Sequence, residues 1–133
     1  LFTPKNPEKY LGDITKIRFL SSWELKFMIV CDTNPYILKW GSEEFRVKYW
    51  NPLKNKVCDY IPDFIIKYKN KQGEVITEVI EIKPKKQSVI SKKMSTYDKA
   101  ALIVNQAKWA AAVSLCESHG ITFRVLTEEE LFG

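Results

Sequence analysis

The stretch Tyr60-Ile-Pro-Asp-Phe-Ile-Ile-Lys-Tyr68 and the later stretch Glu78-Val-Ile-Glu-Ile-Lys83 decide the fold of this chain. Both are rich in β-branched and aromatic residues, and a short polar turn lies between them, so they predict two neighbouring strands. Glu81 and Lys83 are two residues apart and therefore point to the same face of their strand. We expect this acid, this lysine and Asp63 to meet on one face of the sheet.

Length and composition favour a single compact domain over residues 1–133. The chain is 45% hydrophobic and contains no apolar run of about 18 residues that could span a membrane. Its net charge of +5 favours a polyanionic partner. Three scattered cysteines and one histidine predict neither a zinc site nor a disulfide framework, and indicate a reducing compartment. The first residues carry neither an initiator Met nor a signal-peptide pattern, so we expect a short leader to precede Leu1.

The first half of the chain predicts an arm, a helix and a three-strand antiparallel meander. The arm spans residues 1–20, is irregular and basic, and is expected to be solvated rather than bound to DNA. The helix begins at Ser21-Ser22 and ends at Asn34-Pro35. Hydrophobic alternation then predicts strands over residues 42–49, 57–68 and 75–83, with a bulge or an exposed edge at Pro62.

The second half predicts a loop, a long helix, a strand and a short helix. We expect residues 84–96 to form a mobile basic loop. The helix spans residues 97–118, with a buried face marked by Leu102, Ile103, Ala110 and Val113, and Gln106 on the same stripe. The strand at 121–126 should pair in parallel with an earlier strand through a right-handed crossover. Thr127 begins the last helix. The predicted fold is therefore an α/β domain with one mixed sheet flanked by helices.

Asp63 and Glu81 on adjacent strands are suited to metal-assisted hydrolysis of a phosphodiester. Mg²⁺ prefers one or two carboxylates together with water and substrate phosphate. The main-chain carbonyl of Ile82 offers a third oxygen, and Lys83 is placed to orient or deprotonate the attacking water. The simpler interpretation makes Asp63 a strand-edge acid, and Glu81 and Lys83 a surface ion pair.

Two further groups of residues have both a structural and a functional interpretation. Glu24 follows Ser21 by three residues, which is the spacing of a helix capping box, but it is also a candidate site acid. The four lysines of the predicted loop either face solvent or contact DNA phosphates. These lysines are Lys85, Lys86, Lys92 and Lys93.

Pro62-Asp63 followed by Glu81-Ile-Lys83 resembles the signature of the PD-(D/E)xK nuclease superfamily. The predicted element order and the upstream Glu24 also resemble that superfamily's restriction-endonuclease-like core. Several longer stretches are similar to the head-completion nucleases of T-even-like tailed phages: Thr3-Pro-Lys-Asn-Pro-Glu-Lys-Tyr10, Ser21-Ser-Trp-Glu24, Glu81-Ile-Lys-Pro-Lys-Lys86 and Val104-Asn-Gln-Ala-Lys-Trp109.

The resemblance implies a DNA nuclease that depends on Mg²⁺, with Mn²⁺ as a substitute. It implies weak sequence preference and cleavage of packaged double-stranded DNA in the host cytoplasm, so that filled heads can join tails. Phage head or neck proteins are the implied partners, and the virion a further location. It also favours a site role for Glu24 and places Gln106 near the site. Two departures are Leu20, where many phage relatives have arginine, and Ala110, where some branches have tyrosine.

Three alternatives remain open from the sequence. Two share the same chemistry: a junction-resolving nuclease and a transposon-end nuclease. The third is a non-catalytic DNA-binding or head–tail joining protein that keeps a nuclease fold. The presence of Asp63, Glu81 and Lys83 together favours an enzyme over the third alternative.

Overall fold

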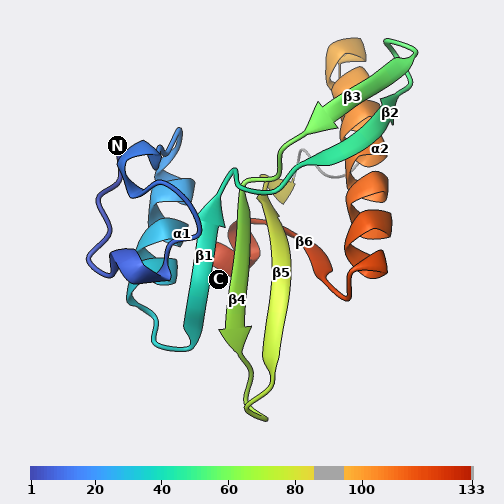
Figure 1. The fold of residues 1–133 in the computed structure, drawn as a ribbon. Helices are drawn as coiled ribbons and strands as arrows, with labels where there is room; N and C mark the ends of the chain where they lie inside the picture. Colours follow the sequence, from blue (N-terminus) through green and yellow to red (C-terminus); the bar gives the residue numbers. More distant parts are fainter. Residues whose placement is uncertain (86–94, 133) are drawn as a thin grey trace.

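The computed structural model describes residues 1–85 and 95–132, and Figure 1 shows the arrangement of their helices and strands. Two 3-10 turns lie in the N-terminal arm. The elements follow in the order η1 (Pro7–Lys9), η2 (Ile14–Lys16), α1 (Ser22–Thr33), β1 (Ile37–Ser42), β2 (Val47–Asn51), β3 (Lys56–Tyr60), β4 (Phe64–Lys69), β5 (Val75–Ile82), α2 (Thr96–Ser118), β6 (Thr122–Leu126) and α3 (Glu128–Phe132). No helix in these described ranges is long and apolar enough to cross a membrane.

The main sheet has the strand order β1-β4-β5-β6. β4 pairs antiparallel with β1 and with β5, whereas β6 pairs parallel with β5 after the α2 crossover. This confirms the predicted mixed sheet flanked by helices, and the arrangement is consistent with a restriction-endonuclease-like fold. β2 and β3 form a separate two-stranded hairpin between β1 and β4.

Two of the three predicted strand ranges are wrong in detail. The first strand of the meander is β1, and the predicted range 42–49 instead crosses the link between β1 and β2. The alternation is interrupted there by Glu43, which has a φ of 56°. The predicted strand at 57–68 is divided into β3 and β4 by residues 61–63. Pro62 lies in that break because it has no N–H to donate to a sheet, and it is buried rather than at an exposed edge.

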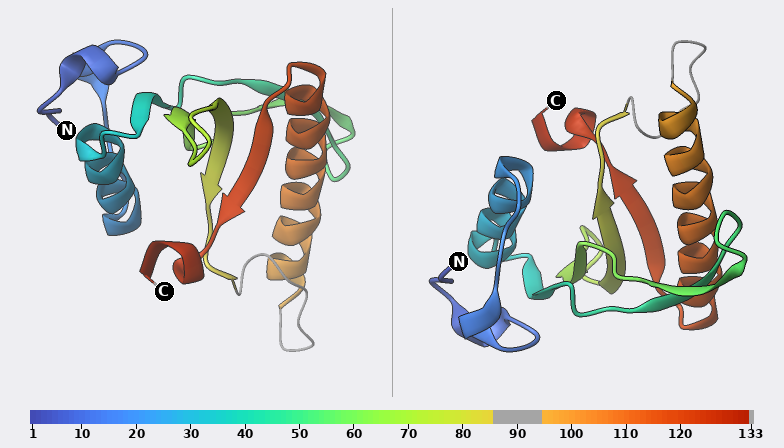
Figure 2. Two further views of the ribbon diagram at one scale, coloured as in Figure 1. Left: turned by 90° about the horizontal axis from the view of Figure 1, so that it is seen from below. Right: turned by 90° about the horizontal axis from the view of Figure 1, so that it is seen from above.

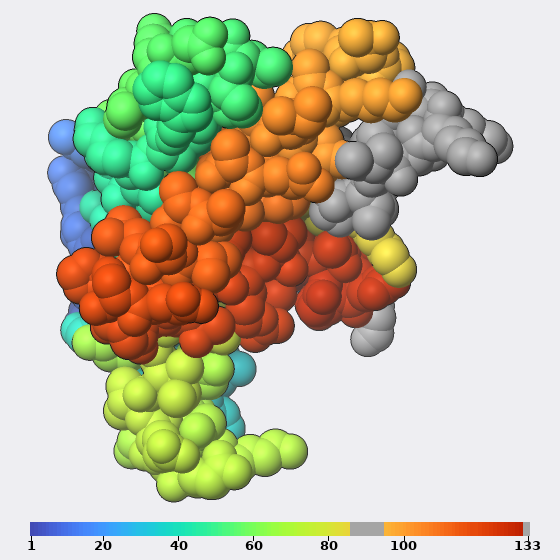
Figure 3. All heavy atoms as spheres, turned by 90° about the vertical axis from the view of Figure 1, so that its right-hand side faces the viewer, coloured from blue at the N-terminus to red at the C-terminus, as the bar shows by residue number. Residues whose placement is uncertain are grey.

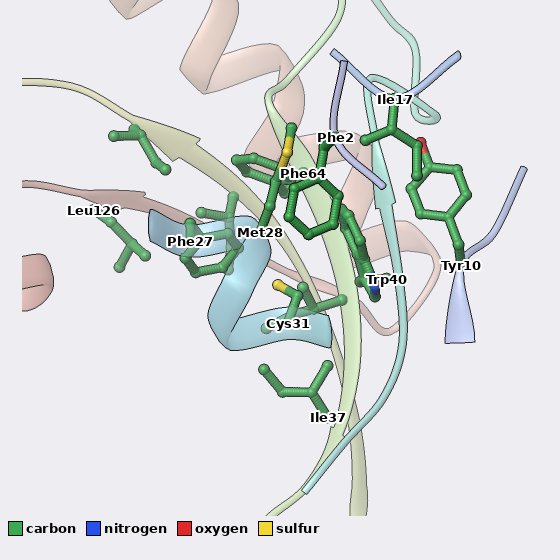
Figure 4. Packing of buried hydrophobic residues seen from close by; sticks show 13 residues of the cluster. Phe2, Tyr10, Ile17, Phe27, Met28, Cys31, Ile37, Trp40, Phe64 and Leu126 are labelled. Atoms are coloured by element: carbon green, nitrogen blue, oxygen red, sulfur yellow. The ribbon is translucent and has the colours of Figure 1, made fainter. Parts of the chain in front are cut away.

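The N-terminal arm packs into the core, so the prediction of a solvated arm is wrong. Phe2, Tyr10 and Ile17 are buried around Trp40, as Figure 4 shows. The Tyr10 and Trp40 rings meet edge to face with centroids 4.7 Å apart. The arm is held by the buried carboxylate of Asp32, which accepts hydrogen bonds from the main-chain N–H groups of residues 5 and 6 at 2.8 and 2.9 Å. These contacts join distant segments, which is why local composition did not reveal them.

The sheet separates two hydrophobic layers. The arm, α1 and α3 cover one face, and α2 with the β2–β3 hairpin covers the other, as the two views of Figure 2 show. The buried side of α2 carries Leu102, Ala112 and Cys116. Ile103 and Val113 are 45% and 39% exposed, so the predicted buried face of this helix is wrong in part. The abundant alanines of α2 make several of its faces similarly apolar, and the sequence pattern therefore cannot select one of them.

The ends of three secondary-structure elements meet at one end of the main sheet. The first turn of α1, the beginning of β4 and the end of β5 all lie towards the upper end of the main sheet in Figure 1. α1 begins there because Ser21 caps it, with the hydroxyl accepting a hydrogen bond from the Glu24 N–H at 3.1 Å. This end of the sheet contains the acids and the lysine that the sequence predicts as active-site residues.

Candidate active site

Asp63 and Glu81 face one another across β4 and β5. Phe64 pairs with Ile80 in the antiparallel register, so the next pair outward places Asp63 opposite Glu81. Opposite residues of an antiparallel pair share a face of the sheet. That face is the one covered by α2, whereas Ile80 and Ile82 point into the core on the α1 side. The structure therefore brings the two acids together as predicted.

The carboxylate of each acid accepts a hydrogen bond from a main-chain N–H of the opposite strand. The Asp63 N–H donates to Glu81 Oε1 at 3.2 Å, and the Ile82 N–H donates to Asp63 Oδ2 at 2.8 Å. The Asp63 carbonyl accepts from the Glu43 N–H at 3.0 Å, which links the site to the end of β1. Each acid is thus oriented by backbone groups of the strands themselves, and this holds a side chain more rigidly than a loop does.

Burial makes the charged state of this pair unfavourable. Glu81 is 7% exposed, and burial raises its pKa while the Lys83 ammonium opposes the rise. Burial, together with the negative charge of Glu81, raises the pKa of Asp63 to about 7. The nearby Lys83 and the Ile82 N–H offset this shift only in part. One buried and one half-buried acid with raised pKa values are typical of a functional site, because a cation placed between them relieves both costs.

Glu24 has the capping role and also lies close to the pair. Its carboxylate accepts hydrogen bonds from the Leu20 N–H and the Ser21 hydroxyl, each at 3.3 Å, which completes a capping arrangement. Its negative charge also contributes to the raised pKa of Asp63. The two interpretations of Glu24 are therefore compatible in the structure.

Tyr60 lies beside Glu81, and Trp109 lies beside Tyr60; neither was expected at the site from the sequence. Burial and then the Glu81 charge raise the pKa of Tyr60, and the hydroxyl in turn lowers that of Glu81. Both the Tyr60 hydroxyl and the Trp109 indole N–H are buried, and neither is aligned with a hydrogen-bond acceptor or donor among the described residues. The sequence offered a hint of Tyr60, because this residue precedes Asp63 by only three positions. It offered a hint of Trp109, because this residue adjoins Ala110, where some branches of the superfamily have tyrosine.

The donor set suits a hard divalent cation such as Mg²⁺. Within the described ranges, no group of three His, Cys, Asp or Glu side chains is close enough to hold a metal ion. Mg²⁺ does not need such a group, because it is commonly held by one or two carboxylates and keeps several waters. The paired acids, whose mutual repulsion a cation would cancel, meet this requirement. A zinc site would need nitrogen or sulfur ligands, and the buried Cys31 and Cys116 lie in the hydrophobic layers.

The residues nominated for DNA contact have different outcomes. Lys86, Lys92 and Lys93 lie outside the described residues. Lys85 is exposed, and its ammonium pairs with Glu129 of α3 at 2.7 Å. Gln106 is exposed on α2 rather than buried. Contact of these five residues with DNA stays a prediction.

Comparison with known proteins identifies the family of this chain. The family described as TnsA-like endonuclease N terminal matches residues 34–128, which include Asp63, Glu81 and Lys83 but not Glu24. A head completion nuclease of Enterobacteria phage T4 is 39% identical over 140 residues, covering 98% of this chain and 91% of that protein. No solved structure gives a significant match. The resemblance inferred from the sequence is confirmed: this chain belongs to the family of TnsA-like endonuclease N-terminal domains.

Proposed function

We propose that this chain is a metal-dependent DNA nuclease that trims packaged phage DNA so that heads can be completed and joined to tails. The observation that carries the proposal is the pairing of Asp63 and Glu81, whose carboxylates are held by main-chain N–H groups of the two strands and whose pKa values are both lowered by the Lys83 charge. The similarity to the phage T4 head completion nuclease over nearly the whole chain supports the biological role. Its family supports the chemistry.

Asp63, Glu81 and the main-chain carbonyl of Ile82 are the groups that would hold the cation. When bound, a divalent cation supplies charge stabilisation at the scissile phosphate and lowers the pKa of a bound water. The ion can be Mg²⁺, with Mn²⁺ as a substitute, because both accept oxygen ligands. Burial of the two acids keeps bulk water away and strengthens their attraction for any cation that enters.

Lys83 acts on the water and the phosphate in this proposal. Lys83 follows directly after β5, two residues from Glu81, and its positive charge lowers the pKa of both carboxylates. From there it can orient the attacking water and reduce the negative charge that develops on the phosphate oxygens. Glu24, at the first turn of α1, can contribute through a water while it continues to cap the helix.

Double-stranded DNA is the proposed substrate, gripped mainly through its phosphates. The net charge of +5 and the lysines of residues 84–96 favour binding that depends little on base sequence. Phage head or neck proteins are the proposed partners, and the host cytoplasm during assembly is the proposed location.

Cleavage of supercoiled plasmid tests the proposal. We expect nicking or linearisation by the intact protein with Mg²⁺, none with a chelator, and a loss of at least about 100-fold in rate for Asp63→Asn, as is usual when a catalytic metal ligand is removed. Asp59→Asn is the matched control, since Asp59 is an exposed acid on β3 that pairs with Arg46 and Lys48. If Asp63→Asn cleaves as well as Asp59→Asn, the activity does not come from this site. Tight DNA binding without any cleavage would instead support the non-catalytic alternative.

A further inference from the structure

The outward face of α2 is a long stripe whose middle part carries no charge. It is formed by residues spaced three or four apart: Lys99, Ile103, Gln106, Ala110, Val113 and Glu117. All six are exposed, and Ile103 and Val113 are exposed to 45% and 39%. Figure 3 looks onto this side of the molecule, with α2 in orange across it. A surface helix of a globular protein normally carries charged residues along its outward face, so this stripe is unusual.

The only two charges of the stripe stand at its two ends, in reversed order with respect to the helix dipole. Lys99 lies near the positive N-terminal end of α2, and Glu117 lies near the negative C-terminal end. Neither side chain forms an ion pair among the described residues. Both charges therefore oppose the dipole of their own helix without local compensation.

The stripe is complementary to itself when a second copy lies antiparallel to it. Turning α2 about a two-fold axis at position 108 places Lys99 opposite Glu117, Ile103 opposite Val113, and Gln106 opposite Ala110. Both end charges then meet an opposite charge, and each also meets the favourable dipole end of the partner helix. The apolar pairs cover one another, and the small Ala110 permits close approach of the two backbones.

We propose that this chain self-associates through the outward face of α2, in an isologous antiparallel pair. The charge complementarity favours a second copy over DNA, because the stripe carries one lysine and one glutamate and therefore has no net positive charge. The charged ends are about 27 Å apart along a helix of this geometry. A contact of that length along one helix buries less than the roughly 1,600 Å² of a standard stable interface, so the dimer should be weak and concentration-dependent.

Sedimentation of the full chain at low salt tests this proposal, and it requires no nuclease activity. We expect the mass to rise with concentration from that of the 15.5 kDa monomer towards the dimer. Lys99→Glu and Glu117→Lys should each weaken the dimer by about 10-fold, since two attractive contacts become repulsive. Both changes agree better with the helix dipole, so each variant should remain at least as stable as the parent. A control variant, Lys71→Glu in the exposed β4–β5 turn, should associate normally.

Mixing the two charge variants gives the sharpest result. The glutamate at position 99 of one variant then faces the lysine at position 117 of the other, and the remaining contact is native, so the mixture should regain the dimer. Ile103→Asp should abolish it. The proposal is overturned if the parent protein stays monomeric up to several hundred micromolar, or if the mixed variants associate no better than each variant alone. Association that is unaffected by Ile103→Asp would place the interface elsewhere and also overturn it.

Discussion

The main-chain N–H of Asp63 donates a hydrogen bond of 3.2 Å to the Glu81 carboxylate, and so the two acids of the site are connected through the backbone. The Ile82 N–H completes the connection by donating to Asp63 at 2.8 Å. The strands thus hold two acidic groups side by side, one buried and one half-buried. This arrangement costs stability in the metal-free protein, and the cost has measurable consequences.

The stability of the metal-free protein should fall as the pH rises. Burial and mutual repulsion raise the pKa of Asp63 from 3.8 to about 7. Its contribution is therefore fully present below pH 4 and is lost as the pH rises through about 7. Asp63→Asn removes this dependence, and it should be more stable than the parent at pH 8 by roughly 2 kcal/mol, allowing for solvent around a half-buried group. Thermal denaturation at pH 5 and pH 8 with a chelator measures this, and an equal pH dependence in both proteins would contradict it.

Replacing Glu24 separates its two roles. Glu24→Gln keeps one oxygen, which can accept the hydrogen bond from the Leu20 N–H, but it removes the second acceptor oxygen and the charge near Asp63. We expect the melting temperature to change little and the cleavage rate to fall by about 10-fold, the lower range for a group that acts through water. Glu24→Ala should lower the cleavage rate in the same way. It should also lower the free energy of unfolding by about 1 kcal/mol, because the helix cap is lost. Normal cleavage by Glu24→Gln would restrict this residue to capping.

Tyr60 should act by positioning Glu81. Tyr60→Phe removes the hydroxyl and leaves the buried ring, whose centroid is 6.4 Å from that of Phe123, so the fold should persist. Because Glu81 would lose the neighbouring hydroxyl that lowers its pKa, we expect a higher Mg²⁺ concentration at half-maximal cleavage, by about three- to ten-fold, within the range for a group beside a metal ligand. Tyr36→Phe is the control, since Tyr36 is 66% exposed. A purely structural role would lower activity without changing the Mg²⁺ dependence.

The lysines of residues 84–96 should determine the salt dependence of DNA binding. Replacing Lys85, Lys86, Lys92 and Lys93 by alanine should reduce the slope of log affinity against log salt by about 0.9 for each phosphate that is no longer neutralised. Ca²⁺ in place of Mg²⁺ keeps the DNA intact during the titration. Lys67, Lys69 and Lys71, near the far end of β4, provide a matched control. An unchanged slope would mean that the loop lysines only face solvent.

The sequence was informative where local chemistry determines the structure. The boundaries of β5 and α1 follow from the polar turn before Val75 and from the Ser21 cap, and the pairing of Asp63 with Glu81 follows from two adjacent strands. It was uninformative where distant segments compete. Burial of the N-terminal arm depends on Asp32, 26 and 27 residues away from its partners. The exposed side of α2 depends on how that helix rests on the β2–β3 hairpin.

A Mn²⁺ binding titration tests the central claim most directly. Bound Mn²⁺ is measured by electron paramagnetic resonance, as the decrease in the signal of the free ion. The claim is that Asp63 and Glu81 together hold the cation. The parent protein and Asp59→Asn should bind Mn²⁺ alike, whereas Asp63→Asn and Glu81→Gln should each bind at least about 10-fold more weakly, because one of two carboxylate ligands is removed. Equal Mn²⁺ binding by the parent and both site variants would contradict the account.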